Sequence, residues 1–351
     1  MCCYIGACSN RWYRLTVCGW MIYDAIVAHN PSNFPLLEHL ALPNLVDSTG
    51  WRAATLDRYQ NAPKLHTLAF GGVPPINKDL DLWTRLTLLD VAQCNSKLKD
   101  VFEICSNLRE LRFRQFETGL PIKLCSPPIS APFVEKLTLS LTQTFYAESG
   151  GLANVIFASI TCPSLTSLFI EGLTGYEDKW PRDAVNDFIS RSAFHLTTLS
   201  IKFVPLLDSD LIDFLHRLPS LVHLTVDDSN IPTNSPSPIT SAFVQSLHAF
   251  PPTNSATNSS VLMKSLKTLS LTFGGPGTFN DRVFVDMVLS RWFSSTYADG
   301  YGPNTSNVRT TCLRSVVMRF TRRDVDQGIY RQLKYLSKEG MRVVVVGQAK
   351  T

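Results

Sequence analysis

The sequence lacks both a long apolar run and a strong excess of one charge. It contains no stretch of about 18 uncharged apolar residues, so no membrane-spanning helix is expected. The longest candidate, residues 15–28, is short and contains Asp24. The net charge is only +4 over 351 residues, which is too small to indicate nucleic acid as a partner. We therefore expect neither a membrane nor a nucleic acid among the partners.

Cysteine is also scarce. The chain has 9 cysteines, an odd number that does not suit a disulfide framework in a chain of this length. The N-terminus shows no basic segment followed by an apolar stretch and a small-residue cleavage site, so no signal peptide is expected. Together these features favour a reducing compartment, and we expect a cytoplasmic or nuclear protein.

Apolar residues, in contrast, make up 44% of the chain and recur in a regular motif. The motif reads apolar-x-x-apolar-x-apolar, often after a Pro or Ser lead-in. The first apolar positions of successive copies are 21 to 31 residues apart, apart from two spacings of 45 and 47. The eleven copies are Trp12/Leu15/Val17, Leu37/Leu40/Leu42, Leu65/Leu68/Phe70, Leu86/Leu89/Val91, Leu108/Leu111/Phe113, Val134/Leu137/Leu139, Leu165/Leu168/Ile170, Leu196/Leu199/Ile201, Leu221/Leu224/Val226, Leu266/Leu269/Leu271 and Leu313/Val316/Met318.

Each copy predicts one strand, because its last two apolar positions alternate with polar ones. Amphipathic stretches between the copies predict helices, and parallel pairing of strands requires such crossovers. The fold class is therefore α/β, a leucine-rich-repeat solenoid or horseshoe with parallel strands on the concave face and helices outside. The expected helices are 97–105, 152–160, 183–191, 239–250, 282–293, 324–338 and one that begins at Asp208-Ser-Asp210.

The two long spacings contain stretches rich in Ser, Asn, Pro and Gly. We interpret them as surface insertions near 229–260 and 294–311, since the repeat resumes after each. The expected domain organisation is a disordered or truncated N-terminus at 1–11 and one irregular array of about eleven repeats at 12–351.

The pattern resembles leucine-rich repeats of the ribonuclease-inhibitor-like, cysteine-containing type. The best local match runs from Leu86 to Cys94, with Cys105 and Cys162 opening later units. With its opening segment 11–17, the chain looks like the repeat region of fungal F-box proteins. That resemblance implies the substrate-binding part of an F-box-like ubiquitin-ligase receptor in a cullin–RING complex. The alternative is a stand-alone repeat scaffold or adaptor unrelated to ubiquitination.

The F-box itself cannot be assigned. This helical module of about 45 residues usually opens with a Leu-Pro pair, yet the repeats already begin near Trp12. The Leu-Pro pairs at 42–43, 120–121 and 218–219 all fall within repeats. Binding to a Skp1-type adaptor is therefore expected only if an F-box lies upstream.

No residue pattern predicts chemistry, so we expect no enzyme, no catalytic residue, no cofactor and no metal site. Cys2, Cys3 and Cys8 have no second ligand pair nearby, and Cys94, Cys105 and Cys162 are expected in the core. The glycines of Gly274-Gly-Pro-Gly277 lack the spacing of a phosphate-binding loop. The seven histidines are scattered, with His39 and His223 expected on the concave face. Arg322-Arg323 is interpreted as the solvated start of the last helix.

What remains is the concave face as a surface for a protein partner. Arginine and aromatic residues dominate binding energy at interfaces, and the central repeats carry both at strand positions that should be exposed. The predicted partner-binding residues are Glu110, Arg112, Arg114, Lys136, Phe169, Glu171, Lys202, His223 and Asp227.

Overall fold

The computed structural model describes most of the chain. The described residues are 9–17, 33–42, 56–70, 80–91, 97–114, 126–143, 151–173, 175–232, 234–250, 261–274, 279–297 and 311–347. They form two compact units. Unit 1 comprises residues 1–165 and 183–194, and unit 2 comprises residues 166–182 and 195–351. Cys2, Cys3, Cys8 and Cys94 lie outside the described residues, as do residues 251–260 of the first predicted insertion and 298–310 of the second.

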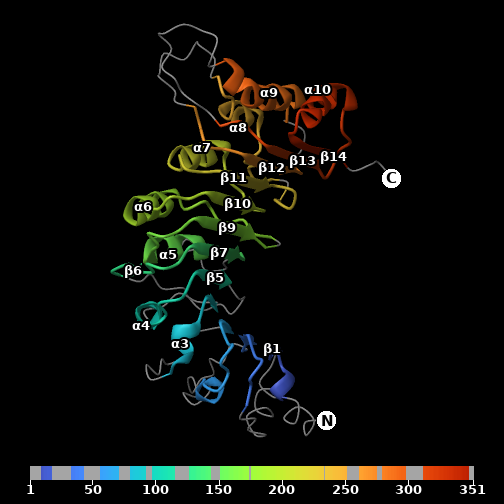
Figure 1. Ribbon diagram of the computed structural model, residues 1–351. Coiled ribbons are helices and arrows are strands. Elements are labelled where there is room, and N and C mark those ends of the chain that lie inside the picture. Colours follow the sequence, from blue (N-terminus) through green and yellow to red (C-terminus); the bar gives the residue numbers. More distant parts are fainter. Residues whose placement is uncertain are drawn as a thin grey trace. The chain divides into compact units, whose positions relative to one another are not determined.

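Unit 1 is built on strands that pair in parallel and follow one another in chain order (Figure 1). Each strand takes its place in register with the one before, so that Leu40, Leu68 and Leu89 lie side by side. The strands are β1 (Arg14–Thr16), β2 (His39–Ala41), β3 (Thr67–Phe70), β4 (Leu88–Val91), β5 (Glu110–Arg114) and β7 (Lys136–Leu141).

Unit 2 repeats this arrangement. Its strands also pair in parallel and in register, with Leu199, Leu224 and Leu269 side by side. The strands are β9 (Ser167–Gly172), β10 (Thr198–Lys202), β11 (His223–Asp227), β12 (Thr268–Phe273), β13 (Ser315–Phe320) and β14 (Arg342–Gly347). All eleven predicted strands are therefore confirmed, and the predicted α/β fold of leucine-rich-repeat type is the observed one.

The last strand, β14, was not predicted. Val343–Val346 are apolar without interruption, so the alternation that reveals a half-buried strand is missing. The position that holds the first apolar residue in other copies is here Gly340, whose φ of 95° lets the chain turn out of the preceding helix. A second unpredicted feature is a small side sheet in unit 1, where β6 (Ile129–Ser130) pairs with β8 (Ile160–Thr161).

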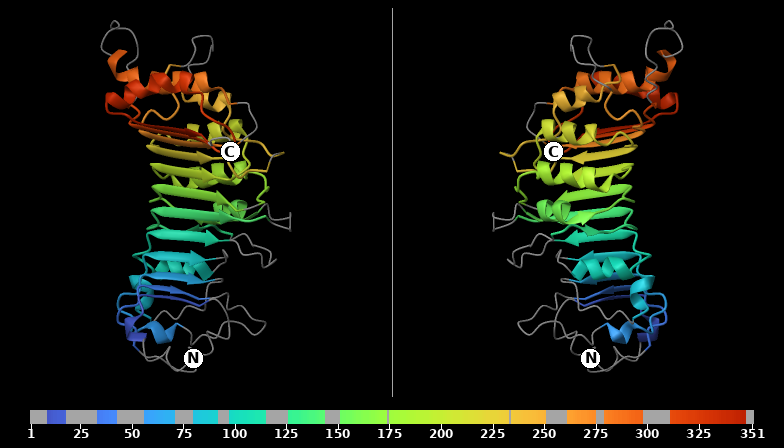
Figure 2. Two further views of the ribbon diagram at one scale, coloured as in Figure 1. Left: turned by 90° about the vertical axis from the view of Figure 1, so that its right-hand side faces the viewer. Right: turned by 90° about the vertical axis from the view of Figure 1, so that its left-hand side faces the viewer.

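Helices connect the strands and lie along one side of them in each unit (Figures 1 and 2). In unit 1 they are α3 (Leu82–Arg85), α4 (Lys97–Ile104), α5 (Gly151–Ser159) and α6 (Arg182–Ser192), with the short 3-10 turns η1 (Ser9–Arg11) and η3 (Asp57–Tyr59). In unit 2 they are α7 (Asp208–His216), α8 (Ser241–Ser246), α9 (Asp281–Tyr297) and α10 (Gln327–Lys338). All predicted helices are present, although α8 is shorter than expected and α3 was not foreseen. None of the helices in the described part of the chain has the length and apolar character needed to span a membrane.

The repeat leucines form the core. Leu68, Leu89, Leu111 and Leu137 in unit 1 are fully buried between strands and helices. Cys105 and Cys162 are buried with them, as predicted. Burial raises the pKa of each thiol to about 12, so both behave as small apolar side chains and not as nucleophiles.

The first predicted insertion is partly packed, which the composition did not indicate. Ile231 and Ile239 are buried in unit 2. Asp228, 2% exposed, accepts a hydrogen bond from the Ser237 hydroxyl and one of 2.6 Å from the backbone N–H of Gly274. A Cβ at Gly274 would lie 2.4 Å from the Ser229 Cα, so this glycine is required by close backbone approach. Residues 251–260 and 298–310 lie outside the described residues.

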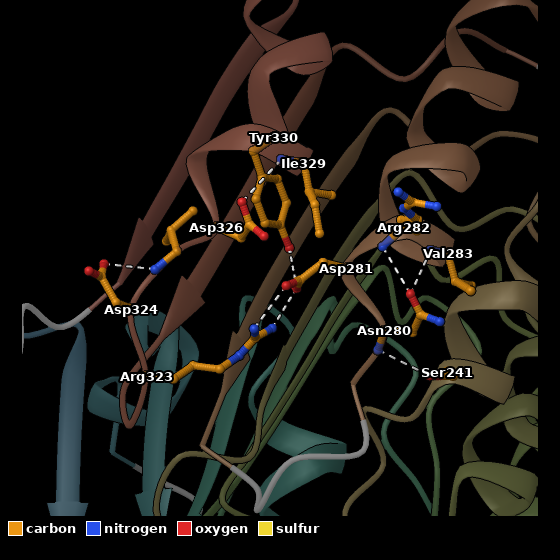
Figure 3. A network of polar contacts seen from close by, with 11 residues as sticks. Ser241, Asn280, Asp281, Arg282, Val283, Arg323, Asp324, Asp326, Ile329 and Tyr330 are labelled. Atoms are coloured by element: carbon orange, nitrogen blue, oxygen red, sulfur yellow. Dashed lines mark hydrogen bonds and ion pairs between the residues drawn. The ribbon is translucent and has the colours of Figure 1, made fainter.

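A polar network joins α9, β13 and α10 in unit 2 (Figure 3). Asp281, at the start of α9, accepts a 2.8 Å hydrogen bond from Arg323 Nη1 and a 2.7 Å bond from the Tyr330 hydroxyl. The Arg323 guanidinium also lies 3.9 Å from the centre of the Phe320 ring. The expectation that Arg322-Arg323 is simply solvated is therefore wrong for Arg323, because a buried carboxylate and an aromatic ring engage it.

Candidate functional site

The candidate site is considered unit by unit: in each, it is the face of the strands opposite the helices, which we call the strand face of that unit. Along β3, β5, β7, β9 and β11, buried residues alternate with more exposed ones. The buried set packs toward the helices, so the alternate set points the other way. In the left view of Figure 2 the strands of each unit lie toward the viewer, with the helices behind them. The nine predicted partner-binding residues all occupy these alternate positions.

In unit 1 the predicted residues form a charged cluster across β4, β5 and β7. Glu110 lies at the centre: Arg112 Nε donates to its Oε1 at 2.7 Å, and Lys136 Nζ lies 2.9 Å from the same oxygen. Arg114 pairs with Asp90 of the neighbouring strand at 2.8 Å. We call Asp90, Glu110, Arg112, Arg114 and Lys136 the charged cluster.

The two carboxylates of the charged cluster have opposite pKa shifts. Partial burial works against the charged form of Glu110, but hydrogen bonds from Arg112 and Lys136 hold its pKa below the ordinary value. Asp90 is more deeply buried, and its pKa is raised by burial despite the nearby Arg114. The three cations remain partly exposed, with side chains 38% to 50% accessible. The three cationic side chains of the cluster are thus paired with carboxylates and still accessible to a partner.

In unit 2 the predicted residues are more spread out. The strand register places Lys202 beside both Glu171 and Asp227. Asp227 Oδ1 accepts hydrogen bonds from the backbone N–H and the hydroxyl of Ser229, so it also fixes the following turn. Phe169 is half-buried and His223 is exposed.

A further group on unit 1 was not predicted as a group. His39 is the first residue of β2, while Glu38 and His66 directly precede β2 and β3. One possible ligand atom from each of the three lies within 4.8 Å of the others. Glu38 Oε2 lies 3.5 Å from His66 Nε2. The rings of His39 and His66 are 5.2 Å apart. A hydrogen bond of 3.1 Å joins the Thr67 hydroxyl to His66 Nδ1.

The electrostatics of this group are set by its neighbours. The hydrogen bond from the Tyr13 hydroxyl is the main reason why the pKa of Glu38 lies below its ordinary value, and His66 adds to the effect. Burial, followed by the nearby charges of Arg14 and His66, lowers the pKa of His39. Sequence reasoning missed the group because His39 and His66 belong to different repeats. Aligning the repeats would have revealed it, since Glu38 and His66 hold equivalent positions.

Unit 2 also has a shallow depression between α8 and α9. Its volume is about 270 Å³, and it is lined by Gln245, His248, Phe250, Val283 and Asp286. His248 Nδ1 accepts a 3.1 Å hydrogen bond from the backbone N–H of Phe250. Most of the surface that these residues expose to the depression is apolar, so the depression is better suited to apolar contacts than to a catalytic site.

The chain matches no protein-family model, and no curated protein matches it. Its function is therefore inferred from the strand face itself.

Proposed function

We propose that this protein is a recognition module that binds a protein partner on its strand face. The observation that supports this is the charged cluster of unit 1. Two arginines and a lysine are held in fixed positions by Glu110 and Asp90 yet keep accessible surface. Arginine held by neighbouring groups loses less side-chain freedom on binding, and it is one of the residue types that dominate interface energies.

The regular strands add geometric support. Neighbouring strands are about 4.8 Å apart, so side chains in register stand in rows across the sheet. Such rows suit an extended protein surface, and binding of this kind needs positioning and no bond chemistry. A small substrate would instead require a concave pocket that encloses most of it and directs a few polar groups at it. The depression between α8 and α9 is open and shallow.

More specifically, we propose that the chain is the substrate-binding part of an F-box-like ubiquitin-ligase receptor. This rests on the resemblance of its repeats to those of fungal F-box proteins. A Skp1-type adaptor would take part only if an F-box lies upstream. The alternative is a stand-alone scaffold or adaptor. The buried free thiols of Cys105 and Cys162 suit a reducing compartment, cytoplasmic or nuclear.

Affinity purification of the whole chain from its native cells tests the proposal. The test variant is Arg112→Glu/Lys136→Glu, which surrounds Glu110 with negative charge. The matched control is Lys99→Glu/Arg331→Glu, which makes the same change of charge at exposed positions on α4 and α10. We expect proteins recovered with the wild type to be retained by the control and lost from the test variant. Equal recovery with both variants would reject the charged cluster as the binding surface.

The ubiquitin-ligase part needs its own readout. The coding sequence ahead of Met1 should contain an in-frame F-box, and the longer product should co-purify with the adaptor and a cullin. If the longer product binds the partner without adaptor or cullin, the scaffold alternative holds.

A further inference from the structure

The strongest unassigned feature of the molecule is the group formed by Glu38, His39 and His66 in unit 1. Two imidazoles and one carboxylate form a common ligand set for first-row transition ions, zinc above all. The ligand atoms converge from adjacent strands within 4.8 Å. The pairing of β2 with β3 sets where the backbones of these three residues lie. His39 pairs with Thr67, and Thr67 directly follows His66 in the chain.

The distances are close to those of a metal centre. Ligand atoms around a tetrahedral zinc ion, each about 2.1 Å from it, are about 3.4 Å apart. Glu38 Oε2 and His66 Nε2 are already 3.5 Å apart. The other ligand atoms lie within 4.8 Å of one another, so an approach of at most about 1.4 Å by His39 completes the geometry. All three side chains are partly exposed, which leaves room for such a rotation.

Neighbouring groups orient these ligands. His66 Nδ1 is hydrogen-bonded to the Thr67 hydroxyl. With the proton on Nδ1, this nitrogen donates to the hydroxyl and Nε2, the nitrogen facing Glu38, is the ligand atom. The Tyr13 hydroxyl donates to the Glu38 carboxylate. Metal-binding histidines and carboxylates are typically held in this way by a second hydrogen bond, which fixes the tautomer and the orientation.

We infer that Glu38, His39 and His66 form a binding site for a divalent transition ion, of which Zn²⁺ is the representative. The three side chains supply two nitrogen ligands and one oxygen ligand. The fourth position opens onto the strand face, where water or a side chain of a partner can complete the coordination. This site is separate from the charged cluster, and its test does not depend on partner binding.

Arg14 opposes the ion. It pairs with His39 in the strand register, and its positive charge already acts on the imidazole. A cation beside the site weakens the binding of a second cation. Removing this charge should therefore tighten metal binding, the reverse of what removing a ligand does.

The experiment is a calorimetric titration of Zn²⁺ into the full chain, prepared without a polyhistidine tag. The ligand variants are Glu38→Gln, His39→Asn and His66→Gln. The matched control is His223→Gln, since His223 holds the same strand position as His39 but in unit 2. We expect each ligand variant to weaken Zn²⁺ binding at least about tenfold. His223→Gln should leave the affinity unchanged, and Arg14→Gln should strengthen it several-fold.

Cobalt spectroscopy separates this site from the cysteines. Co²⁺ bound by nitrogen and oxygen gives d–d bands without the sulfur-to-cobalt charge-transfer band of a thiolate site. Loss of the d–d bands in His39→Asn, with unchanged circular dichroism, would support the site. The inference is overturned if the wild type binds no Zn²⁺, if the ligand variants bind it as the wild type does, or if the charge-transfer band dominates.

Discussion

The two units share one repeat but use charge differently. Unit 1 places its charged groups on the strand face, in the charged cluster and around Glu38, and among these only Asp90 is buried, at 7% exposed. Unit 2 also buries charged groups, among them Asp228, Asp281 and Arg291, each at most 9% exposed. A charged side chain on an exposed face keeps most of its hydration, so it costs little folding free energy and remains available to partners. A buried charged side chain loses its hydration and needs hydrogen bonds or ion pairs instead, and these contacts hold the surrounding structure in place. The difference is in line with the proposal that unit 1 carries the recognition surface, while polar contacts of unit 2 hold its long connections in place.

A pair of arginines shows the contrast. Arg191 on α6 donates to the carbonyl oxygens of Phe157 and Ile160 at 2.6 and 2.9 Å and is partly exposed. Arg291 on α9 is completely buried. It donates to the carbonyl of Met263 at 3.1 Å and to those of Leu247 and Leu262, and burial lowers its pKa to about 10. Both side chains join a helix to the preceding repeat, but only Arg291 does so without access to water.

The largest predicted effect follows from this pair. Arg291→Met keeps the approximate volume but leaves three buried carbonyls without their donor, so it should lower the free energy of unfolding by about 3–5 kcal/mol. Arg191→Met should cost about 1–2 kcal/mol, because water can replace the lost donor. Urea denaturation followed by circular dichroism measures both. If both variants lost the same free energy of unfolding, the burial of the arginine would not be what distinguishes unit 2 from unit 1.

A pH dependence should come from Asp228 in unit 2. Burial raises its pKa to about 6, although the Ser237 hydroxyl and the Gly274 N–H partly offset this. The folded state therefore binds the proton more tightly than the unfolded chain, and this group's contribution to stability increases as pH falls from about 6 toward 4. The gain is about 1–3 kcal/mol.

The substitution Asp228→Asn tests that assignment. The amide is neutral at every pH, so the variant should lose this part of the pH dependence and be at least as stable as the wild type at pH 7. Asp227→Asn, at the adjacent but more exposed position, is the matched control. It should keep most of the wild-type slope, because the Asp227 charge adds less than burial does to the raised pKa of Asp228. Thermal melts between pH 4 and 7 make the comparison, and an unchanged slope in Asp228→Asn would contradict it.

A smaller effect is expected at the network of Figure 3. Tyr330→Phe removes the 2.7 Å hydrogen bond to Asp281 while keeping the buried ring. A hydrogen bond to a charged group contributes about 1.5–3 kcal/mol, and Arg323 continues to neutralise Asp281, so the lower end is expected. Tyr335→Phe on the same helix is the control, since Tyr335 is 58% exposed. Chemical denaturation should show a loss for the first variant and almost none for the second.

The fold could be predicted from the sequence because its signal is local. Strand positions such as Leu111 and Leu137 repeat a short apolar motif, and each copy specifies one strand by itself. The signal failed at Val343–Val346, where a strand is apolar on both faces, and at Gly340, which replaces the first apolar residue. The motif also gave no sign of the side sheet formed by β6 and β8.

Most of the polar contacts could not be predicted, because they join residues from different repeats. Nothing local distinguishes Arg291 from a solvated helix residue, or Arg323 from its neighbour Arg322. The predicted strand-face residues were placed by alternation alone, which is why Glu110, Arg112 and Lys136 were found. The Lys136–Glu110 and Arg114–Asp90 pairs, and the meeting of Glu38 with His66, join neighbouring repeats, so finding them requires aligning the copies with one another and not only reading each copy by itself.

The smallest expected effect on stability is in the charged cluster. Arg112→Gln removes a 2.7 Å contact with Glu110, but Arg112 is 40% exposed and Lys136 remains bound to the same carboxylate. Partly exposed pairs of this kind contribute about 1 kcal/mol or less. Denaturation in urea should therefore show almost no change, while partner binding should weaken, because the guanidinium is the group that a partner would contact. A loss of stability as large as that of Arg291→Met would show that unit 1 also uses its charges to hold its structure, and the contrast between the units would fail.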